Sequence, residues 1–521
     1  DGVKYEFEEG ESTVFNGLSY RSGWYLSKVQ GLKTTDQIHF LYQSQSQATY
    51  PVESVETEVY YTDVAGSSAG MIVPGLKSSD YSTNGAVIFS RNLEEIRFPG
   101  GKIVFVTDGT HQQLQRVEIY GLDITTTDYT LIKQFELTYD TGNSRRLLDK
   151  VKWKDTAGSL VGQYSCGYNI ATPLPAYTSF AKDRWGHYNG QPNTRLLTYQ
   201  SFTAHLYSST GSPTTFFLGG ANREPNETYM KALILSRLDY PTGGHTTFDY
   251  EAHQYLPVSG PAQIAGGLRV KQIISEDANG HSLTKTYRYG AGETGNGTYR
   301  DLSPHTYSTL QRFRRLGFTA GDADYQYNVR VFSSAFATAI MPFDGSVVTY
   351  PMVTEYEDDG SGALGKTVYT FKDDAVDYLK MIIPAAKSAY DSRHWGRGQL
   401  LSKTVYGATG LKKHKQVNTY STLLTGPTPT LGYLMGKSVI RLNSTSPDMS
   451  GCLVDDDIFT IVSYDWHYGR LQLTRSEEYR YNDEDDSKYL YIKTETKVDT
   501  SYFQPIETRL WESDGSLLMQ R

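Results

Sequence analysis

The chain has 521 residues and a formal net charge of −8 at pH 7, with 50 Lys and Arg against 58 Asp and Glu. Its basic residues are scattered along the sequence, which argues against a nucleic-acid partner because phosphate binding requires a concentrated basic face. No apolar run reaches the roughly 18 to 20 residues that a membrane-spanning helix needs, so we expect no transmembrane segment.

Tyrosine is the unusual residue of this composition. There are 42 tyrosines, while the whole hydrophobic class accounts for only 38% of the chain. A tyrosine ring covers apolar surface while its hydroxyl stays hydrated. A chain rich in tyrosine and poor in aliphatic residues therefore predicts thin sheets with water on at least one face.

The first part of the chain predicts strand–turn–strand units. Examples are residues 23–42 and 92–108, followed by strands at 113–122 and 129–140. We place a boundary near residue 130, which divides the chain into an N-terminal β region, 1–130, and a repeat-like segment, 131–521.

Alternation of apolar and polar residues with a period of two recurs further along the chain and predicts half-buried strands. The clearest stretches are 133–140, 160–169, 282–290, 365–373 and 475–482. Turn signals rich in Asp and Gly lie between strands, at 155–158, 241–244, 277–280, 358–362, 407–410 and 512–515. Helical periodicity is scarce, and short helices are expected only at 307–316 and 374–383. The fold class is therefore all-β, built from many antiparallel hairpins.

The hairpins share one pattern. An apolar-led strand runs into an Asp/Gly turn, and the return strand ends in Tyr-x-Tyr or an equivalent. Four copies lie at 146–169, 267–290, 398–421 and 469–482. Their spacing is irregular, with long insertions such as 169–230 and 290–350, whereas a propeller or solenoid would keep its period. The pattern favours one continuously growing sheet.

This pattern resembles the Rhs/YD-repeat family, whose unit runs from a Tyr-Asp or Tyr-x-Tyr strand through a turn to Gly-Arg-Leu. The closest stretches are "YDTGNSRRLLDKV" (139–151) and "YDWHYGRLQLTRSEEYRY" (464–481), and longer phrases such as "KDRWGHYNG" (182–190) and "WGRGQLLSKTVY" (395–406) are similar to surface-exported Gram-negative versions. The resemblance implies a strip of β-sheet that spirals into a hollow shell. It also implies secretion to the cell surface through export machinery and an enclosed C-terminal toxin or other protein cargo.

Two features of that family are not found in this sequence: the self-cleaving segment with its Pro-Gly-rich motif and paired Asp residues, and a variable toxin domain. The chain begins at Asp1 without Met. We therefore expect an excised segment of a larger parent, forming a wall without cargo or a partial wall.

The candidate ligand-binding residues are Asp183, Trp185, Tyr188 and Asn189, together with Trp395 in a second Trp-Gly stretch. Aromatic rings beside polar groups are typical of sugar-binding surfaces, so a surface glycan is a candidate partner. The alternative is a Trp-Gly turn packed on the sheet, with Asp183 accepting backbone hydrogen bonds.

No spacing in the sequence indicates catalysis or a metal site. His-x-x-x-His and Cys-x-x-Cys pairs are absent, as are a Gly-x-Ser-x-Gly elbow and a phosphate-binding glycine loop. We therefore expect no enzyme activity, no catalytic residue, no metal and no cofactor. Cys166 and Cys452 allow either one long-range disulfide or two buried thiols.

The leading hypothesis is a non-enzymatic structural shell of an Rhs-like polymorphic toxin or cell-surface interaction protein, which encloses or displays a cargo domain. The alternative is a cell-surface carbohydrate-binding protein made of β-sandwich domains.

Overall fold

The structure is a computed structural model of residues 1–521. It describes residues 3–15, 18–33, 35–44, 48–50, 55–63, 78–82, 86–109, 113–140, 142, 145–176, 178–204, 213–300, 307–315, 325–334, 347–375, 378–382, 387–391, 393–427, 432–441, 455–464, 467–499 and 504–521. Cys452 lies outside these residues, so the choice between a disulfide and two thiols is untested; Cys166 is half-buried.

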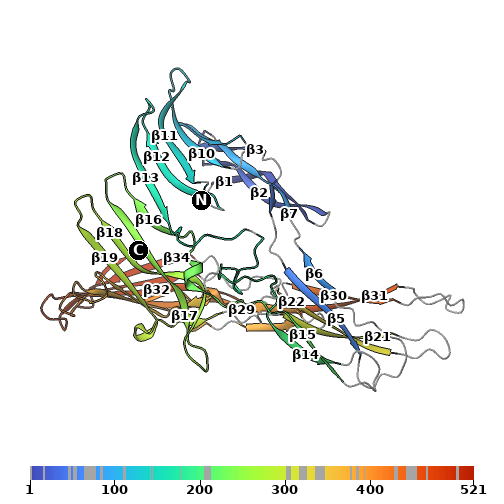
Figure 1. The fold of residues 1–521 in the computed structure, drawn as a ribbon. Coiled ribbons are helices and arrows are strands. Elements are labelled where there is room, and N and C mark those ends of the chain that lie inside the picture. The colour runs from blue at the N-terminus through green and yellow to red at the C-terminus, as the bar shows by residue number, and fades with distance from the viewer. Residues whose placement is uncertain are drawn as a thin grey trace.

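One 23-stranded antiparallel sheet contains most of the strands (Figure 1). Each strand pairs with the next along the following order: β4 (Ala48–Tyr50), β7 (Ala86–Phe89), β1 (Lys4–Phe15), β2 (Leu18–Gln30), β3 (Gln37–Ser44), β8 (Arg91–Phe98), β9 (Gly101–Thr107), β10 (Leu114–Leu122), β11 (Tyr129–Asp140), β12 (Leu147–Lys154), β13 (Leu160–Tyr168), β16 (Leu235–Asp239), β17 (His245–Tyr255), β18 (Gln263–Glu276), β19 (Ser282–Tyr289), β24 (Met352–Tyr356), β25 (Lys366–Phe371), β28 (Leu400–Tyr406), β29 (Lys412–Pro427), β32 (His467–Tyr481), β33 (Tyr489–Val498), β34 (Pro505–Trp511) and β35 (Leu517–Gln520).

From β8 to β35 the sheet is a meander with insertions, whereas β4 and β7 pair beyond β1, at the edge of the sheet. The insertions carry β5 (Val55–Asp63), β6 (Ser78–Ser82), β14 (Gln200–Ala204), β15 (Thr214–Leu218), α1 (Glu227–Met230), η1 (Ala291–Glu293), β20 (Thr298–Tyr299), β21 (Tyr307–Arg315), β22 (Tyr325–Ser333), β23 (Val348–Thr349), β26 (Tyr378–Ile382), β27 (Lys387–Asp391), η2 (His394–Gly396), β30 (Gly432–Arg441) and β31 (Asp455–Tyr464). Two insertions far apart in sequence meet, because β22 pairs with β5 to give the four-stranded sheet β6–β5–β22–β21.

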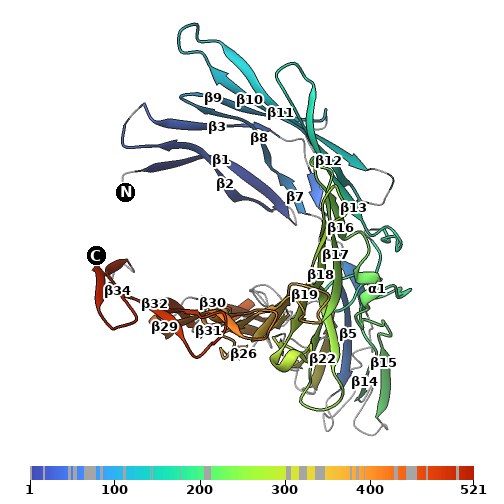
Figure 2. The same ribbon diagram turned by 90° about the vertical axis from the view of Figure 1, so that its left-hand side faces the viewer.

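The long sheet bends into an open arc, and Figure 2 shows the two ends of the chain, near β1 and β34, on its open side. Within the described residues β4 pairs only with β7, and β35 pairs only with β34, so the sheet does not close on itself. The all-β prediction is confirmed in its coarse form, a large antiparallel sheet.

A tyrosine hydroxyl spans the base of six hairpins. In each hairpin the backbone pairing of the two strands ends at a defined residue of the return strand. The tyrosine lies three residues beyond it, and its hydroxyl donates to a backbone carbonyl of the outgoing strand. That carbonyl lies two residues before the paired part of the outgoing strand. The pairs, with O–O distances, are Tyr42 and Leu26 (2.8 Å), Tyr139 and Leu114 (2.7 Å), Tyr168 and Leu148 (2.9 Å), Tyr250 and Leu235 (2.9 Å), Tyr289 and Val270 (2.5 Å), and Tyr420 and Leu400 (3.2 Å). We call these contacts tyrosine clasps.

The clasps give the repeated sequence pattern a physical reason. Where two strands diverge, their carbonyls lose their ladder partners, and an unpaired backbone group away from water costs free energy. A tyrosine reaches across the gap and still covers apolar surface with its ring. Burial raises the pKa of all six hydroxyls, which therefore stay protonated and able to donate.

The second layer of the molecule is small. Tyr60 of β5 and Phe332 of β22 pack against Phe202, Leu218 and Leu197 of the β14–β15 hairpin and the segment before it. The Phe202 ring is stacked on Phe216 with centroids 4.9 Å apart. The β-sandwich alternative needs one sheet packed on another. Such packing is found here between the β5–β22 pair and the β14–β15 hairpin, whereas most strands belong to one open sheet.

Several expectations about individual elements can be checked. The five alternating stretches lie in β11, β13, β19, β25 and β32, as predicted. The two expected helices are wrong, because 307–316 holds β21 and 374–383 holds β26. Both sequences pair with a neighbouring strand, so tertiary pairing overrides a weak local helical preference. The boundary proposed at residue 130 falls inside β11.

Candidate ligand pocket and the tryptophan turns

Asp183 organises the turn that contains the first group of predicted site residues. Its side chain is fully buried, and Oδ1 accepts hydrogen bonds from the backbone N–H groups of Trp185 and His187, both at 2.9 Å. Burial raises the pKa of the Asp183 carboxyl, and its Oδ2 is buried without a hydrogen-bond partner. The backbone carbonyl of Asp183 accepts a hydrogen bond from Arg223.

Asn189 ties the same turn to a neighbouring loop. It is fully buried, and its Nδ2 donates to the carbonyls of Asn222 at 3.0 Å and Glu224 at 3.1 Å. Both Nδ2 hydrogens therefore hold the backbone of the loop before α1. Asp183 and Asn189 act here as internal braces of a turn.

The aromatic members of this turn contact other rings. Trp185 lies edge-to-face with Tyr299, with centroids 6.4 Å apart, and its ring covers Gly266, where a Cβ would lie 2.6 Å from it. Tyr188 lies edge-to-face with Tyr229 at 5.2 Å. These contacts use part of each ring surface that a sugar would need, and both residues are half-buried. Their role in glycan binding stays a prediction.

Trp395 lies in η2, in a different part of the molecule from the turn at Asp183. Its ring packs on Gly469 of β32, where a Cβ would lie 2.3 Å from the ring, and its carbonyl accepts from the side chain of Gln399. Gly469 is thus required because the indole occupies the space of a side chain. The structure brings Asp183, Trp185, Tyr188 and Asn189 together and leaves Trp395 apart.

A pocket of about 430 Å³ lies between the middle strands of the sheet and the loop that follows η2. It is lined by His253, Arg269, Tyr289, Val348, Thr349, Tyr350, Val353, Phe371, Lys372, Asp373, His394, Arg397 and Gly398. None of the five predicted site residues is among them. Two of the lining residues, His394 and Arg397, lie within two positions of Trp395 in the sequence.

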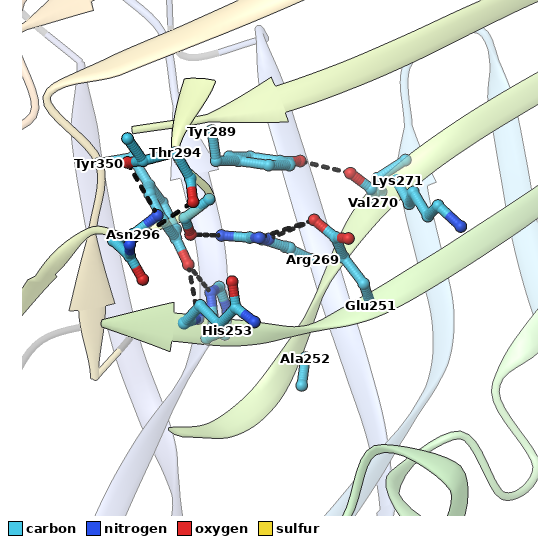
Figure 3. A network of polar contacts seen from close by, with 12 residues as sticks. Glu251, Ala252, His253, Arg269, Val270, Lys271, Tyr289, Thr294, Asn296 and Tyr350 are labelled. Carbon is cyan, nitrogen blue, oxygen red and sulfur yellow. Dashed lines mark hydrogen bonds and ion pairs between the residues drawn. The ribbon is translucent and has the colours of Figure 1, made fainter. Parts of the chain in front are cut away.

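Arg269 lies at the centre of a polar network on the wall of this pocket (Figure 3). Its Nε donates to Glu251 at 2.7 Å, and one of its terminal nitrogens donates to the carbonyl of Gly295 at 2.7 Å. The guanidinium also lies 4.4 Å from the ring centroid of Tyr289 and 4.9 Å from that of Tyr350. Two rings and one carboxylate therefore hold this cation in a fixed position.

His253 extends the network. Its Nδ1 is 3.0 Å from the hydroxyl of Tyr350, and the two rings are stacked with centroids 5.8 Å apart. Burial lowers the pKa of His253 to about 4, with a smaller effect from the charge of Arg269. The imidazole is therefore neutral at pH 7 and adds no charge to the pocket.

Asp373, the carboxylate of the lining, has three hydrogen-bond donors within the protein. It accepts from Arg300 at 2.5 Å and from the hydroxyls of Thr298 and Thr349, both at 2.6 Å. Its neighbour Lys372 donates to Asp374, whose side chain is 72% exposed, at 2.7 Å. The cations that line the pocket, Arg269, Lys372 and Arg397, thus lie beside a carboxylate whose two oxygens already accept hydrogen bonds within the protein.

Sequence reasoning missed this pocket for a physical reason. Its residues come from six strands, η2 and the segments beside them, between positions 253 and 398, and they do not form a short motif. One signal in the sequence is the basic stretch "SRHWGRG" (392–398), which contributes His394, Arg397 and Gly398 to the lining.

Two searches bear on other functional classes. In the part of the chain that the structure describes, no three His, Cys, Asp or Glu side chains gather closely enough to hold a metal ion. No helix among the described residues has the length and apolar character to cross a membrane.

Comparisons with known proteins give little information. No protein-family model matches the chain, and no curated protein matches it. Among solved structures, the chain is similar to one from a Photorhabdus luminescens Tc holotoxin pore, with 9% sequence identity and a TM-score of 0.34. The match covers 95% of this chain and 36% of that chain, so the present chain spans about a third of its length. At this identity and TM-score the match assigns neither family nor function.

Proposed function

We propose that this chain is a non-enzymatic wall segment of an Rhs-like shell, exported to the cell surface, which encloses or displays a toxin or other protein cargo. The support comes from the curved, continuous sheet and from the hairpin pattern of the sequence. The nature of the cargo, the export route and the surface location rest on the family resemblance.

The observation that carries the proposal is the amount of exposed surface. The chain exposes 29,947 Å², whereas a compact monomer of 58.5 kDa exposes about 19,000 Å². A solid globule would bury its central strands beneath further layers, but here most residues of strands such as β10 and β12 are only half-buried. A thin curved wall has the geometry that surrounds contents, while a compact body does not.

The stabilisation of such a wall differs from that of a globule. A deep aliphatic core contributes little to its free energy of folding. Hydrogen bonds between strands and contacts between cross-strand side chains therefore contribute a larger share. Tyr479, Tyr481, Tyr489 and Tyr491 on β32 and β33 illustrate this, because their ring centroids lie 5.1 to 6.3 Å apart in one row. Each such contact contributes roughly 0.2 to 1 kcal/mol.

Small-angle X-ray scattering of the purified chain tests the proposal. A compact chain of 521 residues has a radius of gyration of roughly 24 Å. We expect a clearly larger value, with a pair-distance distribution that fits a curved sheet. A radius at or below the compact value, without an internal void, would refute the wall.

A further inference from the structure

The pocket beside η2 has a wall of fixed positive charge in a chain that is acidic overall. Three cations line it, Arg269, Lys372 and Arg397, against the single carboxylate of Asp373. Arg269 and Arg397 are only 7% and 9% exposed, so these guanidinium groups sit in a partly desolvated setting. Electrostatic interactions are stronger there than at an open surface.

The strength of this positive field is limited by neighbouring carboxylates. Glu251 lies 2.7 Å from Arg269, and Asp374 lies 2.7 Å from Lys372. These partners offset part of the charges of Arg269 and Lys372. A singly charged carboxylate therefore matches the pocket better than a doubly charged phosphate, whose desolvation costs more than this field returns.

The remaining lining indicates what the anion is attached to. Phe371, Val348 and Val353 supply apolar surface, whereas the hydroxyls of Tyr350 and Thr349 already bond to His253 and Asp373. A volume of about 430 Å³ is within the range of small-molecule sites and larger than a bare anion needs. The body of the ligand is thus a ring with an apolar face.

We propose that this pocket binds a small ring-bearing monocarboxylate, with Arg397 and Lys372 facing the carboxylate and Phe371 facing the ring. Arg269 is a positioning residue that fixes Tyr289 and Tyr350 on the wall. This binding role goes beyond the wall function and does not depend on it.

Calorimetric titration of the whole 521-residue chain tests the proposal with four probes. Sodium glucuronate carries a carboxylate on a polar ring, and sodium benzoate carries one on an apolar ring. Glucose lacks the charge, and inorganic phosphate lacks the ring. We expect glucuronate or benzoate to bind at millimolar concentrations or tighter, and glucose and phosphate to bind at least tenfold more weakly. The preferred carboxylate distinguishes a sugar acid from an aromatic acid.

Two variants on the solvent side of the pocket change the charge in opposite directions. Lys372→Gln removes a cation and is expected to weaken carboxylate binding about fivefold, since an exposed ion pair is worth up to about 1 kcal/mol. Asp374→Asn removes the competing carboxylate and is expected to tighten binding by about threefold. The control is Lys152→Gln on β12. That lysine has a similarly exposed side chain, 26% against 28%, and it also pairs with a carboxylate, Glu136, but it lies far from the pocket.

Arg397→Gln is the stronger perturbation, with an expected loss of tenfold or more because the arginine is nearly buried. Its folding is checked by circular dichroism, and the two exposed variants keep the proposal testable if it does not fold. Opposite shifts in Lys372→Gln and Asp374→Asn support the site. The proposal is overturned if neither carboxylate binds, if phosphate binds as well as they do, or if Lys372→Gln and Lys152→Gln behave alike.

Discussion

Removing a single tyrosine hydroxyl should loosen the base of its hairpin without disturbing the packing of the ring. Tyr139→Phe deletes the 2.7 Å hydrogen bond to the carbonyl of Leu114 and keeps the aromatic ring. Tyr129→Phe is the matched control on the same strand. The Tyr129 ring lies 4.8 Å from the amine of Lys102, a contact that a phenylalanine ring retains.

The size of the effect follows from the bond that is lost. A hydrogen bond contributes about 0.5 to 1.5 kcal/mol net, and a carbonyl left buried and unpaired costs about 1 to 3 kcal/mol. Because the hairpin base is partly hydrated, we expect about 1 kcal/mol for Tyr139→Phe and only a few tenths for Tyr129→Phe. Through the local opening equilibrium, 1 kcal/mol corresponds to about fivefold faster amide exchange.

Hydrogen–deuterium exchange read by mass spectrometry measures this directly. Peptides that cover β10 and β11 should exchange about fivefold faster in Tyr139→Phe, while peptides from β32 and β33 remain unchanged. Equal exchange in Tyr139→Phe and Tyr129→Phe would show that the clasp hydroxyl contributes nothing. Faster exchange over the whole chain would indicate a global effect and would also refute the local role.

Two further predictions concern charge. The clasp hydroxyls have pKa values raised by burial above the value of about 10 in an unfolded chain. Their stabilisation is therefore complete below about pH 10 and is lost as the pH rises through the folded values. We expect loss of the β-sheet circular dichroism signal to accompany tyrosinate absorbance, whereas ionisation of the clasps with an unchanged β signal would contradict this. Arg195→Met should destabilise the second layer by about 3 to 5 kcal/mol, because it leaves the fully buried Glu56 and Glu58 without their cation. Faster proteolysis at 195–218 measures this; the exposed pair Arg184–Glu224 provides the control in Arg184→Met, and equal effects of the two variants would argue against it.

The parts of the fold that depend on neighbouring residues could be predicted from the sequence. Alternation in 160–169 follows from one face being wetter than the other, and an Asp-Gly turn such as 155–158 is specified by its own residues. These signals identify the hairpins, and a meander then needs only that consecutive hairpins pair.

The rest could not be predicted because it depends on contacts between distant residues. Nothing within residues 307–316 indicates that this stretch pairs with β22, which pairs in turn with the distant β5, so the local pattern pointed to a helix. The pocket wall shows the same limit, because Arg269, Tyr350 and Arg397 are separated by many strands. For Asp183 the sequence left two roles open, and its hydrogen bonds from the backbone of Trp185 and His187 match the Trp-Gly turn, whereas its role in ligand binding stays a prediction.

The contact between the first insertion and β22 has a consequence for synthesis of the chain. The meander can form hairpin by hairpin as it leaves the ribosome, since each strand pairs with a recent neighbour. Glu56, however, donates its backbone N–H to Ser334, which lies 278 residues later. At about 5 to 20 residues per second, that partner arrives roughly 14 to 56 s after Glu56. The pairing of β5 with β22 therefore forms late, after the strands between them have been synthesised. Until then the edge of β5 that pairs with β22 is open to chaperones or to mispairing.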